Sequence, residues 1–186
     1  MALLSSKIDP EKWTTQFLLK YGIDDPSIPV EKIAEKEGIE LVFTDLGDNV
    51  SGVLVIKNGR ATIGCNKADS QVRKRFTIAH ELAHYFLHYN AATSLLTEEV
   101  FVDKDFFMKF RVFSKVSYDP AEMQQENEAN AFAAALLMPK HLIEKELFKD
   151  EYLNLKEVDV IDKLAKTFKV SNTAMTYRMT NLNLLF

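Results

Sequence analysis

Two histidines four residues apart, His80 and His84, lie inside a segment whose apolar residues recur at helical spacing. The recurring apolar positions are Val72, Phe76, Ala79, Ala83 and Phe86. This spacing predicts a helix over about residues 70–89. Residues four apart on a helix are offset by about 40° around its axis, so both imidazoles project from one face. The pattern therefore predicts that one helix carries two ligands for a single metal ion.

Glu81 completes an HExxH motif over residues 80–84. On a helix it is displaced from the histidine before it by less than about a third of a turn, so its carboxylate lies beside the metal without binding it. A general base needs this position to take a proton from water at the metal. The motif alone fixes only three positions, and two surface histidines with a salt-bridging glutamate would also produce it. Its place among apolar helical residues favours the catalytic interpretation.

A third ligand must come from elsewhere in the chain, because a catalytic zinc site usually has three protein ligands and one open position. Residues 85–89 are Tyr-Phe-Leu-His-Tyr, so the motif does not extend through a glycine to a third histidine at the spacing of a metzincin site. A carboxylate on another helix is the remaining source. Such a helix is predicted over about residues 119–138, with Asp119 as its cap, Pro120 in its first turn and Pro139 at its break.

Three glutamates on this second helix are candidates for the third ligand: Glu122, Glu126 and Glu128. Only Glu126 has an asparagine, Asn130, one turn later on its own face, where an amide can hydrogen-bond within a metal site. This favours Glu126 and leaves the other two glutamates as alternatives.

The composition describes an ordinary globular chain of 186 residues, 47% hydrophobic and 27% charged. Its net charge of −4 leaves no basic surplus for phosphate groups, so direct nucleic-acid binding is not expected. A single cysteine, Cys65, excludes an intramolecular disulfide. The first residues lack the features of a signal peptide, and no apolar stretch approaches the roughly 18 residues of a membrane span. We expect a soluble, cytoplasmic protein without a membrane partner.

Upstream of the motif, the pattern predicts two helices and a small sheet. The helices are expected over about residues 10–21 and 29–38, a strand over residues 39–43 and a hairpin over residues 50–65. An Asn-Gly pair at residues 58–59 suits the tight turn of that hairpin. Residues 93–118, which hold a cluster of phenylalanines, are predicted as loop and irregular strand. The order of elements predicts an α+β fold.

The C-terminal residues predict two further helices. Val158, Ile161, Leu164, Ala165 and Phe168 form a helical stripe, and Ser171 is placed to cap a helix that runs to about residue 181. The pair is helix-turn-helix-like, yet from Glu157 onward it has only four basic residues against three acidic ones. That balance is poor for binding phosphate groups. We therefore predict a packing or substrate-docking module, with a DNA-binding regulator as the weaker alternative.

Three sequence blocks connect these observations: residues 75–84 (RFTIAHELAH), 126–134 (ENEANAFAA) and 136–139 (LLMP). Through them the chain, from about residue 30 onward, resembles the ImmA/IrrE family of metallopeptidases. The resemblance implies a gluzincin-like zinc site in which His80, His84 and Glu126 are the ligands. It also implies a zincin-like domain with helices around a small twisted β-sheet. We place this peptidase domain at residues 1–150 and the C-terminal helical module, packed on it, at residues 151–186.

Members of that family commonly cleave a helix-turn-helix repressor and so relieve repression of transcription. The resemblance thus implies a zinc-dependent endopeptidase with a protein substrate of that kind. The alternative is a regulatory binding protein that keeps the zinc site but sequesters its partner without cleavage. The presence of Glu81 favours the peptidase.

The sequence leaves two questions about the site open. Five residues are chemically able to stabilise an oxyanion, and the pattern does not rank them: Tyr85, His88, Arg111, Tyr118 and His141. His88 lies one turn beyond His84, but a partly exposed histidine at a helix end is the simpler interpretation. Cys65 could bind a metal, yet its position at the end of an apolar strand favours a small buried hydrophobe.

Overall fold

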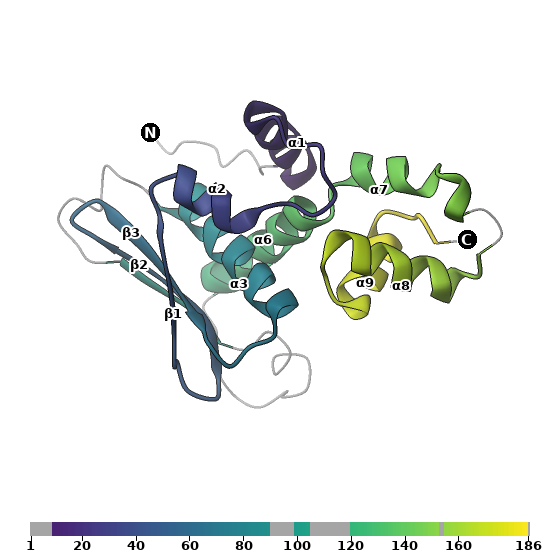
Figure 1. Ribbon diagram of the computed structural model, residues 1–186. Helices are drawn as coiled ribbons and strands as arrows, with labels where there is room; N and C mark the ends of the chain where they lie inside the picture. The colour runs from purple at the N-terminus through teal and green to yellow at the C-terminus, as the bar shows by residue number, and fades with distance from the viewer. Residues whose placement is uncertain (1–8, 90–98, 105–119, 153–154, 186) are drawn as a thin grey trace.

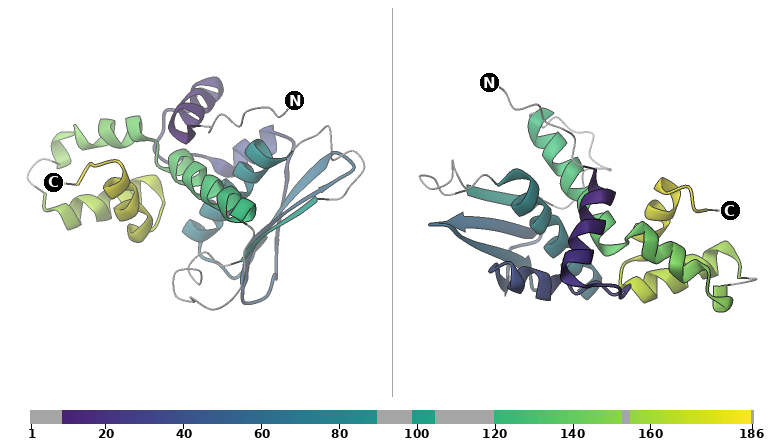
Figure 2. Two further views of the ribbon diagram at one scale, coloured as in Figure 1. Left: turned by 180° about the vertical axis from the view of Figure 1, so that it is seen from behind. Right: turned by 90° about the horizontal axis from the view of Figure 1, so that it is seen from above.

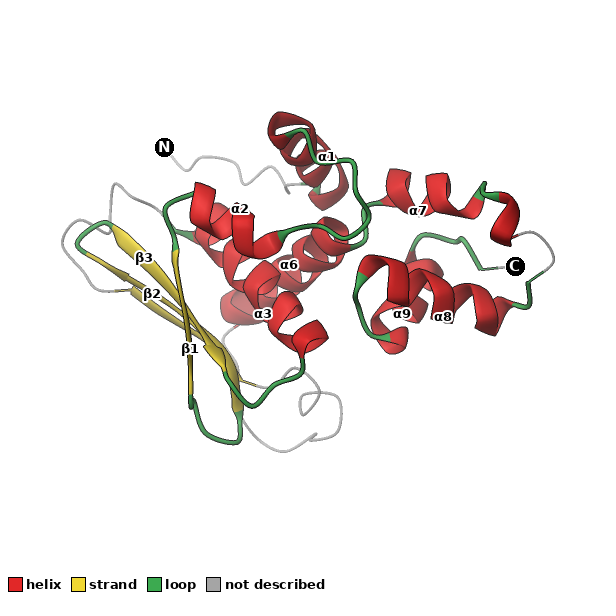
Figure 3. Ribbon diagram, in the orientation of Figure 1, coloured by secondary structure: helices red, strands yellow, loops and turns green. Residues whose placement is uncertain are grey.

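A four-stranded mixed β-sheet lies at one edge of the molecule, and the described helices lie to one side of it (Figure 1). The strands are β1 (Glu40–Thr44), β2 (Val50–Lys57), β3 (Arg60–Asn66) and β4 (Glu99–Lys104), in the order β1-β3-β2-β4. The computed structural model describes residues 9–89, 99–104, 120–152 and 155–185. Helices and strands are segregated in space (Figure 3), so the predicted α+β class is confirmed.

The hairpin predicted over residues 50–65 is present as β2 and β3. Asn58 and Gly59 form its turn with φ angles of 51° and 73°, both positive, as a type I′ turn requires. β1 runs parallel to β3, whereas β2 is antiparallel to both β3 and β4. The strand predicted over residues 39–43 begins and ends one residue later. Within the segment predicted as loop and irregular strand, β4 is the described part, and residues 93–98 and 105–118 lie outside the described residues.

The HExxH motif begins on α3 (Gln71–Ala83) and ends at His84, where α3 continues directly into a π-helical turn, η1 (His84–His88). Ser70 caps α3, since its hydroxyl accepts a hydrogen bond from the Arg73 amide at 3.3 Å. The last turn departs from the predicted α-helix, because the Tyr89 amide donates to the His84 carbonyl, five residues back, at 3.0 Å. Such π-turns are rare and occur frequently at functional sites.

The predicted acidic helix is α6 (Pro120–Leu137), which packs against α3. It ends just before Pro139, as predicted, while its expected cap, Asp119, lies outside the described residues. Two elements that the sequence pattern did not predict follow: α7 (Lys140–Leu147) and the short 3-10 helix η2 (Asp150–Tyr152).

An aromatic cluster joins α1 (Pro10–Tyr21) to η1 and α6. The ring centroid of Trp13 lies 4.9 Å from Phe17, 5.1 Å from Phe86 and 4.8 Å from Phe132. The second predicted helix, α2 (Val30–Lys36), contacts α3 and β1. These contacts, together with the packing of α3 on β2 and β3, fix the helix that carries the motif between the sheet and α6.

The predicted C-terminal helices are α8 (Glu157–Phe168) and α9 (Asn172–Asn181). Ser171 caps α9 as predicted, accepting a hydrogen bond from the Ala174 amide at 3.1 Å. Together with α7, the pair forms the end of the molecule away from the sheet, where the C-terminus lies (Figure 2). Among the described helices, none is both long and apolar enough to cross a membrane.

Two buried arginines tie the α8–α9 pair to the rest of the chain. Arg75 of α3 donates to the Lys169 carbonyl at 3.3 Å, in the turn between α8 and α9. Arg178 of α9 forms an ion pair with Glu11 at 2.6 Å and donates to the Met138 carbonyl at 2.9 Å. The pair is therefore fixed through hydrogen bonds to α1, to α3 and to the end of α6.

Candidate metal centre

The three side chains predicted as metal ligands lie together where α3 packs against α6. His84 Nε2 lies 3.4 Å from one carboxylate oxygen of Glu126, and His80 Nε2 lies 3.7 Å from the other. The two Nε2 atoms are 3.0 Å apart. One ligand atom from each residue lies within 4.8 Å of the other two. Two imidazoles and one carboxylate are a donor set of catalytic zinc sites, so these residues fit a divalent metal ion.

The site is buried on its histidine side and more open on its carboxylate side. The side chains of His80 and His84 are 2% and 3% exposed, whereas that of Glu126 is 26% exposed. Of the three side chains, that of Glu126 is therefore the one with substantial contact to solvent.

Asn130 orients the first histidine. Its Oδ1 lies 3.1 Å from Nδ1 of His80. Because this oxygen only accepts hydrogen bonds, the proton of the neutral imidazole resides on Nδ1, and Nε2 keeps its lone pair toward the cluster. Metal-binding histidines usually have such a partner on the second nitrogen. Asn130 therefore contacts the cluster through the imidazole of His80.

His84 has a different partner, His88. The Nδ1 atoms of the two rings lie 3.0 Å apart, and His88 Nε2 lies 3.2 Å from a carboxylate oxygen of Glu128. The His88 side chain is only 5% exposed, so the expectation of a partly exposed histidine at a helix end is wrong. Burial lowers the pKa of His88 below its usual value, and the hydrogen bond to Glu128 raises it in part. The packing of η1 against α6 decides this burial.

Glu81 is fully buried and faces the sheet. A Cβ atom built on Gly52 of β2 would lie 3.0 Å from the Glu81 carboxylate, so the strand passes directly over this side chain. Glu81 thus lies between α3 and β2, next in the helix to His80. A buried carboxylate beside a metal ligand is chemically suited to exchange protons with a bound substrate.

The structure distinguishes the three candidate glutamates of α6. Glu126 faces both histidines of the motif. Glu128 instead contacts His88, and its other oxygen accepts a hydrogen bond from Gln124 at 2.8 Å. Glu122 is exposed in the first turn. Only the first of these carboxylates joins the group that can hold an ion among the described residues.

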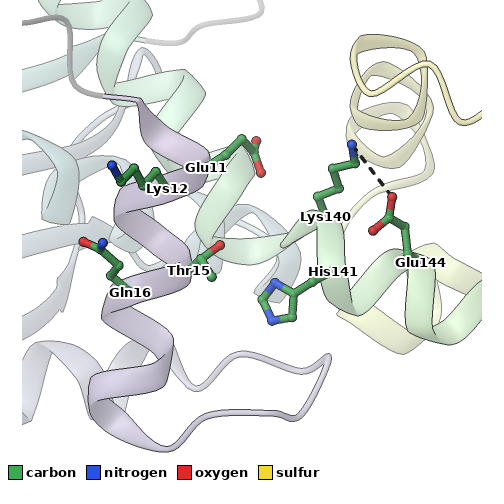
Figure 4. Close-up of a pocket in the computed structure, with 7 residues that line it drawn as sticks. All are labelled: Glu11, Lys12, Thr15, Gln16, Lys140, His141 and Glu144. Carbon is green, nitrogen blue, oxygen red and sulfur yellow. Dashed lines mark ion pairs between the residues drawn. The ribbon is translucent and has the colours of Figure 1, made fainter.

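Two of the five oxyanion candidates, Tyr85 and His141, have surroundings of their own in the structure. The Tyr85 ring stacks on Tyr89 with centroids 5.5 Å apart, and burial raises its pKa. His141 lies on α7, where its ring faces α1 across a surface hollow (Figure 4). α6 continues from Glu126 to Leu137, roughly 16 Å of helix, before α7 begins. His141 is therefore far from the candidate ligand Glu126 along the α6 axis.

Two further oxyanion candidates cannot be placed, whereas Cys65, considered as a possible metal ligand, can. Arg111 and Tyr118 lie outside the described residues, as do the phenylalanines at positions 106, 107, 110 and 113. Cys65 is fully buried within the core, and burial, with a smaller contribution from the nearby Glu81 charge, raises its pKa to about 12. A neutral, buried thiol of this kind packs as a small hydrophobe, as predicted.

Comparison with known families decides the assignment of the chain. The profile of the peptidase M78 family, described as the IrrE N-terminal-like domain, matches residues 34–180. The chain belongs to this family. The match includes α3, α6, α8 and all but the last residue of α9, and it confirms the resemblance to ImmA/IrrE proteins.

A solved structure supports the fold of this IrrE-like chain. A protein described as a Mycobacterium tuberculosis transcriptional regulator superposes over 92% of the chain with a TM-score of 0.59 and 17% sequence identity. The chain spans 46% of that regulator's length, about half. At this identity the likeness concerns the fold alone. A search of curated proteins found no match.

The sequence pattern of this IrrE-like domain missed two features of the site. The regular spacing of His80, His84 and His88 places all three on one helix face, which was the available signal for a buried His88. Gly52 interrupts an apolar strand, and a glycine inside a strand often marks the close approach of another element. Neither signal identifies the partner residue. His88 meets Glu128, and Gly52 meets Glu81, only once α3 and η1 are packed against α6 and β2.

Proposed function

We propose that this protein is a zinc-dependent endopeptidase in which His80, His84 and Glu126 hold the metal and Glu81 is the general base. The observation that carries the proposal is the convergence of two buried imidazoles and one carboxylate within 4.8 Å. Membership in a peptidase family supports hydrolysis of a peptide bond as the reaction.

Zinc held by His80, His84 and Glu126 would supply Lewis-acid activation of water and of the scissile carbonyl. Glu81 would take a proton from the attacking water and pass it to the leaving amine. Its burial against β2 restricts the carboxylate to one region of the site. Asn130 and His88 hold the two ligand imidazoles by their Nδ1 atoms, which keeps both Nε2 lone pairs on the side of Glu126.

The proposed substrate is a helix-turn-helix repressor, whose cleavage would relieve repression of transcription. This choice is supported by the family resemblance, and the net charge of −4 argues against DNA as a direct partner. We propose that residues 151–186 form a module packed on the peptidase domain that docks this substrate. Val158 of α8 and Tyr177 of α9 are 76% and 65% exposed, which gives the module apolar surface for a protein partner.

The test pairs the purified protein with the helix-turn-helix protein encoded beside it. We expect cleavage with zinc, no cleavage after chelation, and a loss of at least about 100-fold in rate for Glu81→Gln, because general acid–base catalysis contributes about that much or more. The variant should keep the wild-type zinc content. Glu122→Gln, on the exposed first turn of α6, is the matched control and should cleave normally.

Two outcomes would contradict the proposal. Cleavage by Glu81→Gln at the wild-type rate would exclude the general-base role. A stable complex with the partner but no cleavage by the wild-type protein would instead favour the sequestering function.

A further inference from the structure

We propose that His88 and Glu128 are positioning residues for the metal ligand His84, acting as a two-step hydrogen-bonded chain from the ligand to a carboxylate. The inference rests on the proposed function, since it concerns the same metal site. The observation that carries it is the continuous path from His84 through His88 to Glu128, with successive distances of 3.0 and 3.2 Å.

The donors and acceptors of this chain agree with one assignment of protons. His84 Nε2 faces His80 and Glu126, so it is the nitrogen that offers its lone pair to the ion. The proton of His84 then resides on Nδ1, which donates to Nδ1 of His88. His88 in turn carries its own proton on Nε2 and donates it to Glu128. Every polar atom along this path has a complementary partner.

The π-turn η1 and the residues packed around it fix the geometry of this hydrogen-bonded path. η1 begins at His84 and ends at His88, so the whole histidine pair lies within the π-turn. Phe86 anchors the same turn in the aromatic cluster, 5.1 Å from Trp13. On the opposite helix, Gln124 donates to the second oxygen of Glu128 at 2.8 Å. Both ends of the hydrogen-bonded path from His84 to Glu128 are therefore held in place by residues outside that path.

The two ligand histidines are thus supported by different chemistry. The amide of Asn130 orients His80 without charge, whereas the path from His84 ends on a carboxylate. A carboxylate that accepts a hydrogen bond from a ligand histidine raises the basicity of the ligand and fixes its ring orientation. Here His88 transmits that effect across one additional ring, so removing either member of the chain should weaken metal binding.

The experiment measures zinc affinity by competition with a chromogenic chelator, together with the visible spectrum of the cobalt(II)-loaded protein. His88→Phe keeps a ring of similar size and removes both nitrogens. We expect it to lower zinc affinity by about 10–100-fold, as is usual for the loss of such a partner, and to change the cobalt spectrum. His141→Phe, the same substitution at the histidine on α7, should leave both measurements unchanged.

Substitutions at Glu128 separate a positioning role from a general loss of structure. Glu128→Gln keeps an acceptor oxygen and should lose less affinity than Glu128→Ala. In the His88→Phe background, Glu128→Ala should add no further loss, because both residues act through one path to His84. Circular dichroism of each variant establishes that it is folded.

The inference is overturned if folded His88→Phe binds zinc with wild-type affinity and an unchanged cobalt spectrum. It is also overturned if the effects of His88→Phe and Glu128→Ala are fully additive. Failure of the proposed function has a different signature: the wild-type protein would bind zinc but cleave nothing, while the affinity differences among these variants would persist.

Discussion

Gly52 of β2 lies directly against the carboxylate of Glu81, the residue that we propose as general base. A Cβ atom at this position would lie 3.0 Å from Glu81 Oε1 and would overlap the Thr77 methyl group. The strand can approach α3 this closely only because position 52 has no side chain. A glycine in the sheet thereby determines where the carboxylate of Glu81 is held.

Gly52→Ala should therefore reduce both stability and activity. Forcing a methyl group into a packed region costs typically about 1–3 kcal/mol, measurable as a lower free energy of unfolding in urea. Activity should fall further than stability explains, because Glu81 must move away from the added methyl group.

Thr77→Ser in the same protein separates the two effects, since it deletes the methyl group that the alanine would overlap. The double variant should regain most of the lost stability while activity stays low. If activity returns together with stability, the contact between position 52 and Glu81 has no role in catalysis.

Removing the metal should lower the melting temperature, because an ion held by His80, His84 and Glu126 would stabilise the folded protein over the unfolded one. At free zinc about 100 times its dissociation constant, binding stabilises a protein by about 2.7 kcal/mol, which corresponds to a rise in Tm of roughly 5–10 °C for a chain of this size. Glu126→Ala should lose most of this rise in a thermal-shift measurement with zinc against chelator. Glu122→Ala should keep it, and an equal rise in both variants would exclude Glu126 as a ligand.

Arg178→Met should loosen the C-terminal helices from the rest of the chain. The guanidinium group contacts both carboxylate oxygens of Glu11 and the Met138 carbonyl, and the side chain of Arg178 is 7% exposed. Its loss leaves the carbonyl without this donor, at a cost of about 1–3 kcal/mol in the free energy of unfolding. Glu11→Gln keeps an acceptor at a more exposed position and should cost less. If Arg178→Met leaves the free energy of unfolding unchanged, this contact is not needed to hold α8 and α9 against the rest of the protein.

The Cys65 thiol should be unreactive in the folded protein at neutral and mildly alkaline pH. Its pKa is raised from 9.0 to about 12, first by burial, so the thiolate that reacts with disulfide reagents forms only near pH 12. In guanidinium chloride the pKa returns to its ordinary value and the thiol should react rapidly at pH 9. Because the folded state holds its proton more tightly, this group's contribution to stability is complete below pH 9 and is lost as pH rises through about 12. Rapid labelling of the native protein at pH 8 would contradict this burial.

Some features of the fold follow directly from neighbouring residues. Asn58 and Gly59 make a hairpin turn because both tolerate positive φ, and Ser70 and Ser171 cap helices by accepting from amides three residues ahead. The spacing of His80 and His84 likewise requires only a helix. These predictions succeeded because each depends on contacts within a few residues.

Other features depend on how the elements pack. The α-helical prediction over residues 70–89 missed the π-turn at His84–His88, and the burial of His88 was mispredicted for the same reason. Anchoring of Phe86 against Trp13 and Phe132 involves α1 and α6, which are distant in the sequence. Local propensity contains no information about such contacts.

The sequence by itself determined that two imidazoles share one helix face and that a second helix offers acids to complete the site. Only the tertiary structure decided that Glu126 meets both imidazoles, that Glu128 meets His88 and that Gly52 meets Glu81. The physical reason is that a helix fixes the angles between its own side chains, whereas the rotation and offset of α3 against α6 and β2 are set by the burial of apolar residues from the whole chain.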